Sequence, residues 1–193
     1  MLAIAQYGAG NIFSLCKAIE RIGAPYVVTS NIVELEAATH IILPGVGEAA
    51  SVIKEIKSTD LISFLKSTVK PVLGICIGMQ VMCSYSQEGD IDCMGLFPNK
   101  VEKLRGDNIK IPHMGWNRVS DLKGALFNDI NNGEWFYFVH SYAPSLDSST
   151  IAVTEHGGVF SSALNYRNYY GTQFHPEKSG EAGEQLLRNF LAL

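Results

Sequence analysis

The sequence predicts an α/β fold in which a mostly parallel central sheet carries helices on both faces. Short apolar, β-branched segments alternate with segments of helical period over residues 1–85, a pattern typical of such a sheet. Between Leu96 and Gln173 short strands and turns replace this alternation, which predicts added antiparallel strands in the second half. With 193 residues, 47% of them hydrophobic and 18% charged, the chain is expected to form one domain over residues 1–193.

The first half begins with an expected strand at Met1–Gln6, followed by a turn at 7–11. The next apolar residues share one helical stripe: Ile12, Leu15, Cys16, Ile19 and Ile22. This stripe predicts a helix that ends at Gly23 and Pro25. Further strands are expected at Tyr26–Thr29 and His40–Leu43, where apolar residues run without interruption.

Pro44-Gly45-Val46-Gly47 opens a loop, and Val52, Ile53 and Ile56 then mark one face of a helix. Pro71–Ile75 is the next expected buried strand. The second half offers three shorter ones, at Trp135–Val139, Ile151–Thr154 and Tyr169–Gln173. A final helix is expected from its apolar face, which comprises Ala182, Leu186, Leu187, Phe190 and Leu191.

Composition excludes several classes of function. A net charge of -4 gives no broad basic surface, so no nucleic-acid partner is expected. The most apolar stretch, Pro71–Cys83, is shorter than the roughly 20 residues that cross a bilayer. The first basic residue is Lys17 and the four cysteines show no C-x-x-C spacing, so we expect a reduced, cytoplasmic protein without a secretory signal.

Neither a bound cofactor nor a metal is expected. Gly8-Ala9-Gly10 follows the first strand, but the third glycine of a dinucleotide fingerprint is replaced by Phe13. No acidic residue ends the second strand either, since Thr29-Ser30-Asn31 stand there. Histidines and cysteines show no metal-ligand spacing.

Gly74-Ile75-Cys76-Ile77-Gly78 lies where a buried strand is expected to meet a helix. This is the glycine-flanked nucleophile elbow with cysteine in place of serine, and the glycines leave room for a crowded backbone. A thiol at the start of a helix also gains from the helix dipole, which favours the reactive thiolate. A buried structural cysteine is the alternative interpretation of the same pattern.

Gln173-Phe174-His175-Pro176-Glu177 places a base and an acid two residues apart after an expected strand. In an extended segment such residues point to the same side, so Glu177 could orient His175. A surface turn is the alternative. A parallel sheet gathers functional residues at the carboxyl ends of its strands, so Cys76 and His175 together favour a catalytic site.

These segments together resemble the class I (triad) glutamine amidotransferases, which have a flavodoxin-like fold. Pro44-Gly45-Val46-Gly47 and the two segments above are typical of that superfamily. The Tyr-Gly-x-Gly-Asn start, Pro112-His113-Met114-Gly115-Trp116-Asn117 and the Glu-Lys-Ser-Gly-Glu segment that begins at Glu177 resemble, more narrowly, the glutaminase subunits of imidazole glycerol phosphate synthase. The likeness extends from the first expected strand to the last helix.

The resemblance implies a role for each matching position. The implied catalytic triad is Cys76, His175 and Glu177, with an oxyanion hole at Gly45, Val46 and Ile77. The implied glutamine-binding residues are Gly47, Gln80, Glu88, Ser141 and Tyr142. The implied partner-facing residues are Asn11, His113, Trp116, Tyr137 and Lys178.

The implied activity is hydrolysis of L-glutamine to L-glutamate and ammonia. The ammonia would pass to a (β/α)8-barrel cyclase subunit, bound as a heterodimer, which forms imidazole glycerol phosphate and AICAR in histidine biosynthesis. Three alternatives stay open: an amidotransferase subunit of another pathway such as sugar amidination in surface-glycan synthesis, a noncatalytic scaffold protein, and a cysteine hydrolase of related fold. An intact triad and the glutamine-site residues argue against the last two.

Overall fold

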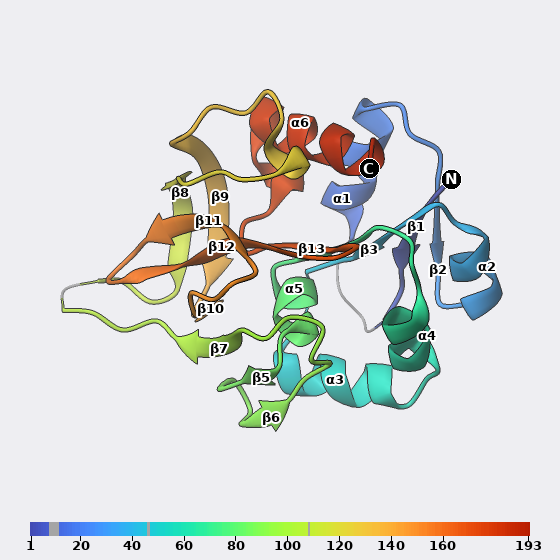
Figure 1. Cartoon of the computed structure of the whole chain (residues 1–193), viewed down its shortest axis with the longest axis horizontal. Helices are drawn as coiled ribbons and strands as arrows, with labels where there is room; N and C mark the ends of the chain where they lie inside the picture. Colours follow the sequence, from blue (N-terminus) through green and yellow to red (C-terminus); the bar gives the residue numbers. More distant parts are fainter. Residues whose placement is uncertain (8–11, 46, 108) are drawn as a thin grey trace.

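A computed structural model describes residues 1–7, 12–45, 47–107 and 109–193. Within these ranges the main sheet has seven strands in the order β11-β12-β13-β4-β3-β1-β2 (Figure 1). Their bounds are β1 (Leu2–Ala5), β2 (Tyr26–Thr29), β3 (His40–Leu43), β4 (Val72–Ile75), β11 (Thr150–Glu155), β12 (Val159–Tyr166) and β13 (Tyr169–Thr172). Neighbours from β2 to β13 pair in parallel, whereas β12 pairs antiparallel with both β13 and β11. The predicted fold class is therefore confirmed.

Alternation along the strands builds two cores, one on each face of the sheet. In β1, Leu2 and Ile4 face one core while Ala3 and Ala5 face the other, and all four are buried. A strand that is covered on both faces needs apolar residues at successive positions, which explains its uninterrupted apolar sequence.

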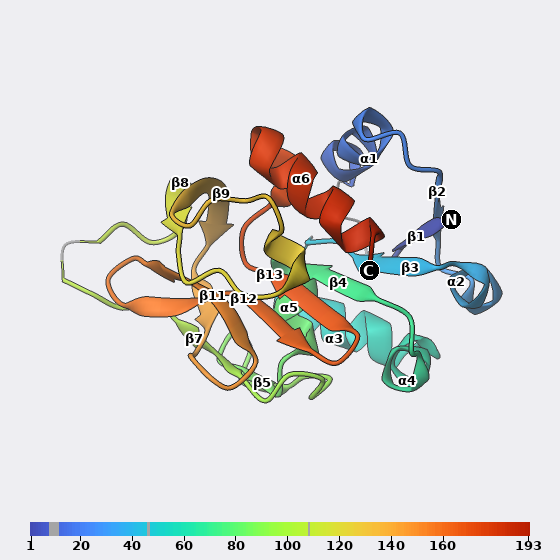
Figure 2. The same ribbon diagram turned by 45° about the horizontal axis from the view of Figure 1, so that its top comes forward.

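Helices cover both faces, as Figures 1 and 2 show. On one face lie α1 (Phe13–Arg21), α6 (Gly180–Leu191) and the short η1 (Ala125–Phe127). On the other lie α3 (Ala49–Lys57), α4 (Leu61–Ser67) and α5 (Ile77–Met82), with α2 (Ile32–Ala37) beside β1 and β2. The expected helices at 12–22, around Val52 and at the carboxyl end are confirmed as α1, α3 and α6.

Smaller sheets extend the second half. One has the order β10-β7-β5-β6, and β8 pairs antiparallel with β9. The bounds are β5 (Tyr85–Ser86), β6 (Ile91–Asp92), β7 (Lys100–Lys103), β8 (His113–Val119), β9 (Glu134–His140) and β10 (Tyr142–Pro144). The β8–β9 pair packs Phe136 and Phe138 into the core that α1 and α6 cover. This packing holds β9 next to the segment that follows the carboxyl end of β13.

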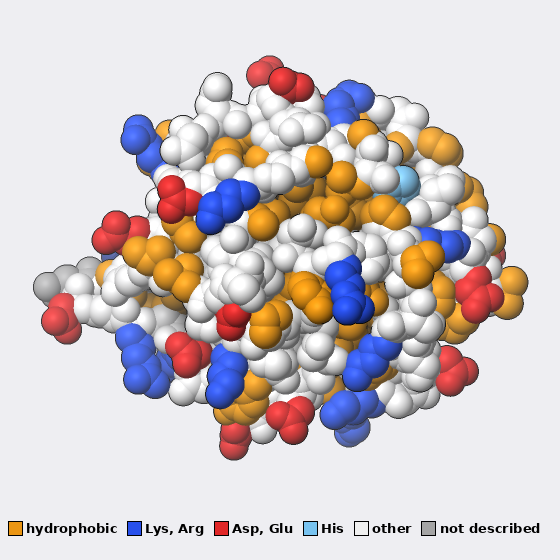
Figure 3. Space-filling model, in the orientation of Figure 1, with side chains coloured by type: hydrophobic (Ala, Val, Ile, Leu, Met, Phe, Trp, Pro, Cys, Tyr) orange, Lys and Arg blue, Asp and Glu red, His pale blue; other side chains and the backbone are white. Residues whose placement is uncertain are grey.

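On the face drawn in Figure 3, side chains of both charges are interspersed among apolar ones. The described helices are too short or too polar to span a lipid bilayer.

Candidate active site

Cys76 occupies a strained turn between β4 and α5. Its backbone has φ 51° and ψ -111°, a conformation that costs a non-glycine residue about 1–3 kcal/mol. The turn brings backbones close together: a Cβ on Gly74 would lie 2.6 Å from the backbone nitrogen of Met79, and one on Gly78 would overlap the carbonyl of Leu43. Both glycines are therefore needed to hold the cysteine in this position.

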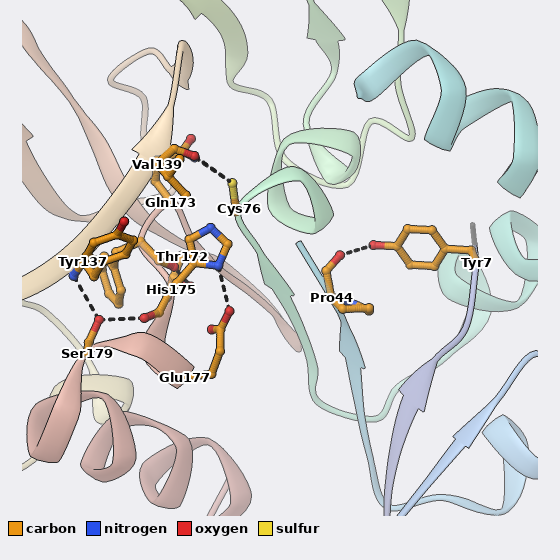
Figure 4. Close-up of polar contacts among 11 residues, drawn as sticks. Tyr7, Pro44, Cys76, Tyr137, Val139, Thr172, Gln173, His175, Glu177 and Ser179 are labelled. Carbon is orange, nitrogen blue, oxygen red and sulfur yellow. Dashed lines mark hydrogen bonds and ion pairs between the residues drawn. The ribbon is translucent and has the colours of Figure 1, made fainter. Parts of the chain in front are cut away.

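His175 and Glu177 form a buried pair just after β13. Nδ1 of His175 lies 2.7 Å from Oε1 of Glu177, and the two side chains are 6% and 9% exposed. In Figure 4 the imidazole lies between Glu177 and Cys76. Nε2 has no hydrogen-bond partner of ordinary length among the described residues, which leaves it available to the thiol proton.

The surroundings of His175 favour the protonated ring. Burial alone lowers its pKa, but the negative charge and hydrogen bonding of Cys76 and of Glu177 outweigh burial and raise the pKa to about 10. A carboxylate on Nδ1 holds the tautomer and stabilises the imidazolium that forms when Nε2 takes a proton. The pair can therefore serve as base and then as acid.

Ser179 ties this segment to β9. Its Oγ donates to the carbonyl of His175 at 2.6 Å and accepts from the backbone N–H of Tyr137 at 3.0 Å. The N–H of His175 in turn donates to the carbonyl of Tyr137 at 2.9 Å. The backbone of Tyr137 in β9 thus holds the segment at both ends of η2 (Pro176–Lys178), through His175 and through Ser179.

Ser179→Ala tests this support. Loss of the buried hydroxyl leaves the N–H of Tyr137 unpaired, which costs about 1–3 kcal/mol, so we expect a lower unfolding temperature. If the chain has the glutaminase activity that the resemblance implies, its kcat should fall about 3- to 10-fold. Thermal unfolding and steady-state kinetics measure both. Ser51→Ala, on the exposed side of α3, is the control. Unchanged stability and kcat in Ser179→Ala would show that the clamp contributes nothing.

A pocket of about 290 Å³ opens above Cys76. Its lining comprises Gly45, Gly47, Cys76, Ile77, Gln80, Glu88, Val139, His140, Ser141, Tyr142, His175 and Lys178. The structure thus brings together the residues expected to bind glutamine, the nucleophile and the base. Glu177 lies behind His175, and Val46 lies outside the described residues. A larger hollow of about 570 Å³ between β8 and β11 is lined by none of the three triad residues. The pocket above Cys76 is therefore distinguished by its lining residues and not by its volume.

Hydrogen bonds already orient two of the pocket residues. Nε2 of Gln80 donates to the carbonyl of Tyr142 at 2.8 Å, so its Oε1 is the atom that can accept from a ligand. Oε2 of Glu88 accepts from the N–H of Ala49 at 3.1 Å, which joins that carboxylate to the start of α3. Both groups are acceptors suited to an ammonium.

Three of the residues expected to face a partner lie together beside the base. The rings of Trp116 and Tyr137 are 6.1 Å apart, and Nζ of Lys178 lies 5.8 Å from the Tyr137 ring centre. Trp116 is 53% exposed. His113 instead is buried, with its Nδ1 3.0 Å from Nε2 of His140. Asn11 lies outside the described residues.

Contacts of Cys76 include residues that the sequence did not single out. Cys76 Sγ lies 3.9 Å from the carbonyl of Val139 and 3.6 Å from Nε2 of Gln173. Gln173 belongs to the same run as His175 and is the last residue of an expected strand, so its position at the strand end was the available signal. Among the described residues, no group of three histidine, cysteine or acidic side chains is placed to hold a metal ion.

Comparison with known proteins identifies the family. The family model described as "Glutamine amidotransferase class-I" matches residues 3–193. The chain is 47% identical to the imidazole glycerol phosphate synthase subunit HisH of Bacteroides fragilis, over 100% of this chain and 99% of that protein. It is 41% identical to the subunit of the same name from Idiomarina loihiensis, over 100% and 97%.

Solved structures agree on the fold. A putative GMP synthase protein from Thermoplasma acidophilum superposes with a TM-score of 0.75 at 18% identity, covering 99% of this chain and 92% of that one. A crystal structure of a glutamine amidotransferase gives a TM-score of 0.76 at 16% identity, covering 99% and 97%. By its full-length identity and its family match, this chain belongs to the class-I glutamine amidotransferases and, within them, to the imidazole glycerol phosphate synthase subunits named HisH.

Proposed function

We propose that the chain, acting as one domain over residues 1–193, is the glutaminase of an imidazole glycerol phosphate synthase in histidine biosynthesis. It hydrolyses L-glutamine and supplies ammonia to a cyclase subunit in a cytoplasmic heterodimer. The observation that carries the proposal is a single pocket that holds Cys76 and His175 together with Gln80, Glu88 and Tyr142. An amidotransferase subunit of another pathway is disfavoured by full-length identity of 41–47% to subunits named HisH.

The reaction uses the geometry of the triad. The thiol proton of Cys76 moves to Nε2 of His175, and Sγ attacks the side-chain amide carbon of glutamine. His175 then gives that proton to the departing ammonia, which leaves a glutamyl thioester. Water, deprotonated by the same nitrogen, attacks the thioester carbon; the C–S bond breaks, glutamate leaves, and Nε2 of His175 returns the proton to Sγ of Cys76. Glu177 keeps Nδ1 of the ring protonated in the proposed cycle.

We propose that the developing oxyanion is bound by backbone N–H groups. Ile77 supplies one at the start of α5, and the Gly45–Val46 loop supplies the other; each donor is worth about 3 kcal/mol in the transition state. We propose that the α-ammonium of glutamine is bound by acceptor oxygens of Gln80 and Glu88. Its α-carboxylate is bound by backbone groups of Ser141 and Tyr142. Gly47 lies in the same pocket wall.

Reconstitution tests the function. The purified chain is mixed with a cyclase subunit, its imidazole precursor and glutamine, and formation of imidazole glycerol phosphate and glutamate is measured. One product for each glutamine hydrolysed supports the proposal. Glutamine hydrolysis that no histidine-pathway cyclase can use would assign the chain to another pathway.

We propose that the partner docks on a surface formed by Trp116, Tyr137 and Lys178. Partner control gives a further prediction at Lys178, the exposed residue of this docking surface that directly follows the triad. If a loop donor is turned away in the free chain, glutamine kcat is depressed by about 10² to 10³, and partner with bound substrate restores it. In Lys178→Ala we expect the stimulation to fall at least about 10-fold with basal hydrolysis retained. Turnover is compared for the chain alone, with partner, and with partner plus its substrate.

Lys66→Ala, on the exposed side of α4, is the matched control and retains full stimulation. A free chain that hydrolyses glutamine as fast as the complex would eliminate partner control.

A further inference from the structure

Gln173 is a fully buried amide that faces the nucleophile. Its side chain is 0% exposed, and Nε2 lies 3.6 Å from Sγ of Cys76. The backbone N–H of Gln173 donates to the carbonyl of Ser162 at 2.9 Å, which continues the pairing of β13 with β12 and fixes where the side chain begins. A buried amide needs partners for both of its ends, and here one partner is the reacting atom.

Neighbouring groups determine which end of the amide meets the sulfur. The carbonyl of Tyr142 can only accept, so the Gln80 atom 2.8 Å from it is the NH2 group. The same nitrogen lies 2.9 Å from the Gln173 amide. Because that nitrogen can only donate, it faces Oε1 of Gln173. The NH2 group of Gln173 is therefore directed at Cys76.

The carbonyl of Tyr142 is also bound by His140, which in turn is bound by His113. Nδ1 of His140 donates to this carbonyl at 2.9 Å, so Nε2 of the neutral ring accepts, and His113 Nδ1 donates to it at 3.0 Å. Burial lowers the pKa of His140 to about 3 and that of His113 to about 4, which keeps both rings neutral near pH 7. Gln80 and His140 therefore donate to the two lone pairs of the Tyr142 carbonyl. This sets the donor and the acceptor of every hydrogen bond from His113 to Gln173.

A reversed Gln173 amide would be opposed at both ends. Its NH2 group would meet the NH2 group of Gln80, and its oxygen would meet the lone pairs of the sulfur, with which it cannot form a hydrogen bond once the thiol has lost its proton. In the observed direction the amide donates to Sγ, and a hydrogen bond to a charged group is among the stronger ones in proteins. The carbonyl of Val139, 3.9 Å from Sγ, can accept from the thiol but gives nothing to the thiolate.

We infer that Gln173 is a further catalytic residue of this site, whose amide N–H stabilises the Cys76 thiolate and whose Oε1 links the nucleophile to the glutamine-binding residue Gln80. The inference rests on the proposed function for its use of the thiolate. Gln173 exchanges no proton: the thiol proton goes to Nε2 of His175, and the amide hydrogen stays on nitrogen and bonds to the sulfur that remains.

Alkylation of Cys76 by iodoacetamide tests this without glutamine. The rate is measured against pH for the full chain, peptide by peptide with mass spectrometry, so that Cys16, Cys83 and Cys93 are counted separately. In Gln173→Met, which keeps the length of the side chain but cannot donate, we expect the midpoint of the Cys76 profile to move up by about one pH unit. With the partner present, kcat for glutamine should fall about 10- to 100-fold.

Ser162→Ala is the matched control. Ser162 is buried beside Gln173 in β12, and its Oγ has no hydrogen-bond partner among the described residues, so its loss should leave the profile unchanged. Thermal unfolding establishes that each variant is folded. If Gln173→Met does not fold, Gln173→Asn draws the amide back by one methylene and should shift the midpoint in the same direction.

An unchanged midpoint in a folded Gln173 variant would overturn the inference. Failure of the proposed function looks different: wild-type protein with its partner then hydrolyses no glutamine, while the alkylation profiles still report whether Gln173 acts on the sulfur.

Discussion

Cys76→Ala is expected to have the largest effect of any substitution: it should abolish formation of imidazole glycerol phosphate from glutamine but leave its formation from added ammonium salt intact. Without Sγ, placed by the strained turn at φ 51°, no thioester forms, and the loss in kcat for glutamine should reach about 10⁴- to 10⁶-fold. The ammonia reaction takes place on the partner and needs only that the two chains assemble. Both syntheses are measured on the same purified complex.

The ammonium reaction serves as the internal control for assembly in this experiment. Cys76→Ser extends it, because a serine hydroxyl in the same position is a weaker nucleophile than a thiolate and should also be inactive with glutamine. Glutamine hydrolysis that survives undiminished in Cys76→Ala would refute the assignment of the nucleophile.

His175→Ala is expected to have the second-largest effect and to exceed Glu177→Gln. Removing the imidazole eliminates both proton transfers, a loss of about 10⁴- to 10⁶-fold in kcat. In Glu177→Gln a neutral amide can still accept from Nδ1 across the 2.7 Å contact, so the loss should be about 10- to 100-fold smaller. Steady-state kinetics of the complex measures both, and equal or reversed severities would contradict the two roles.

Glu177→Gln also has a signature in pH-dependent stability. The pKa of His175 in the folded chain, about 10, lies above the ordinary value of about 6.5. The protonated ring therefore stabilises the fold fully below about pH 6.5, and this contribution disappears as the pH rises towards 10. Because Glu177 supplies part of the upward shift, the free energies of unfolding of wild type and Glu177→Gln should differ most near pH 6 and converge towards pH 10.

Local patterns in the sequence predicted the parallel half of the fold closely. Apolar runs located β2 and β3 at the bounds that the structure has. β3 is covered on both faces and tolerates few polar residues, whereas β2 is a partly buried edge strand whose Tyr, Val and Thr residues favour a strand. The same reasoning missed α2 and α4, which have only six and seven residues and show too few turns for a helical period. The two-residue strands β5 and β6 are defined by their partners rather than by their own sequence.

The sequence predicted those parts of the site that lie within short local motifs. The glycine-flanked Cys76 and the His-Pro-Glu run are local patterns, and the structure places them at neighbouring strand ends. The contact of Gln173 with Cys76 joins residues 97 positions apart and depends on a chain of amide directions that no spacing encodes. His113 and Trp116 stand three positions apart in β8, and the alternation of side chains in a strand sends them to opposite faces, which separates His113 from the exposed cluster.

Tyr137 places an evolutionary constraint on this chain. Its backbone N–H donates to Ser179 and its carbonyl accepts from His175, while its ring lies against Trp116 and Lys178 on the proposed docking surface. In the proposed function, partner recognition and support of the base therefore share Tyr137, through different atoms. Related proteins that bind a different partner could therefore carry other side chains on this surface. The backbone register of β9 would have to stay the same, because a shift of one residue would break the hydrogen bonds that position His175.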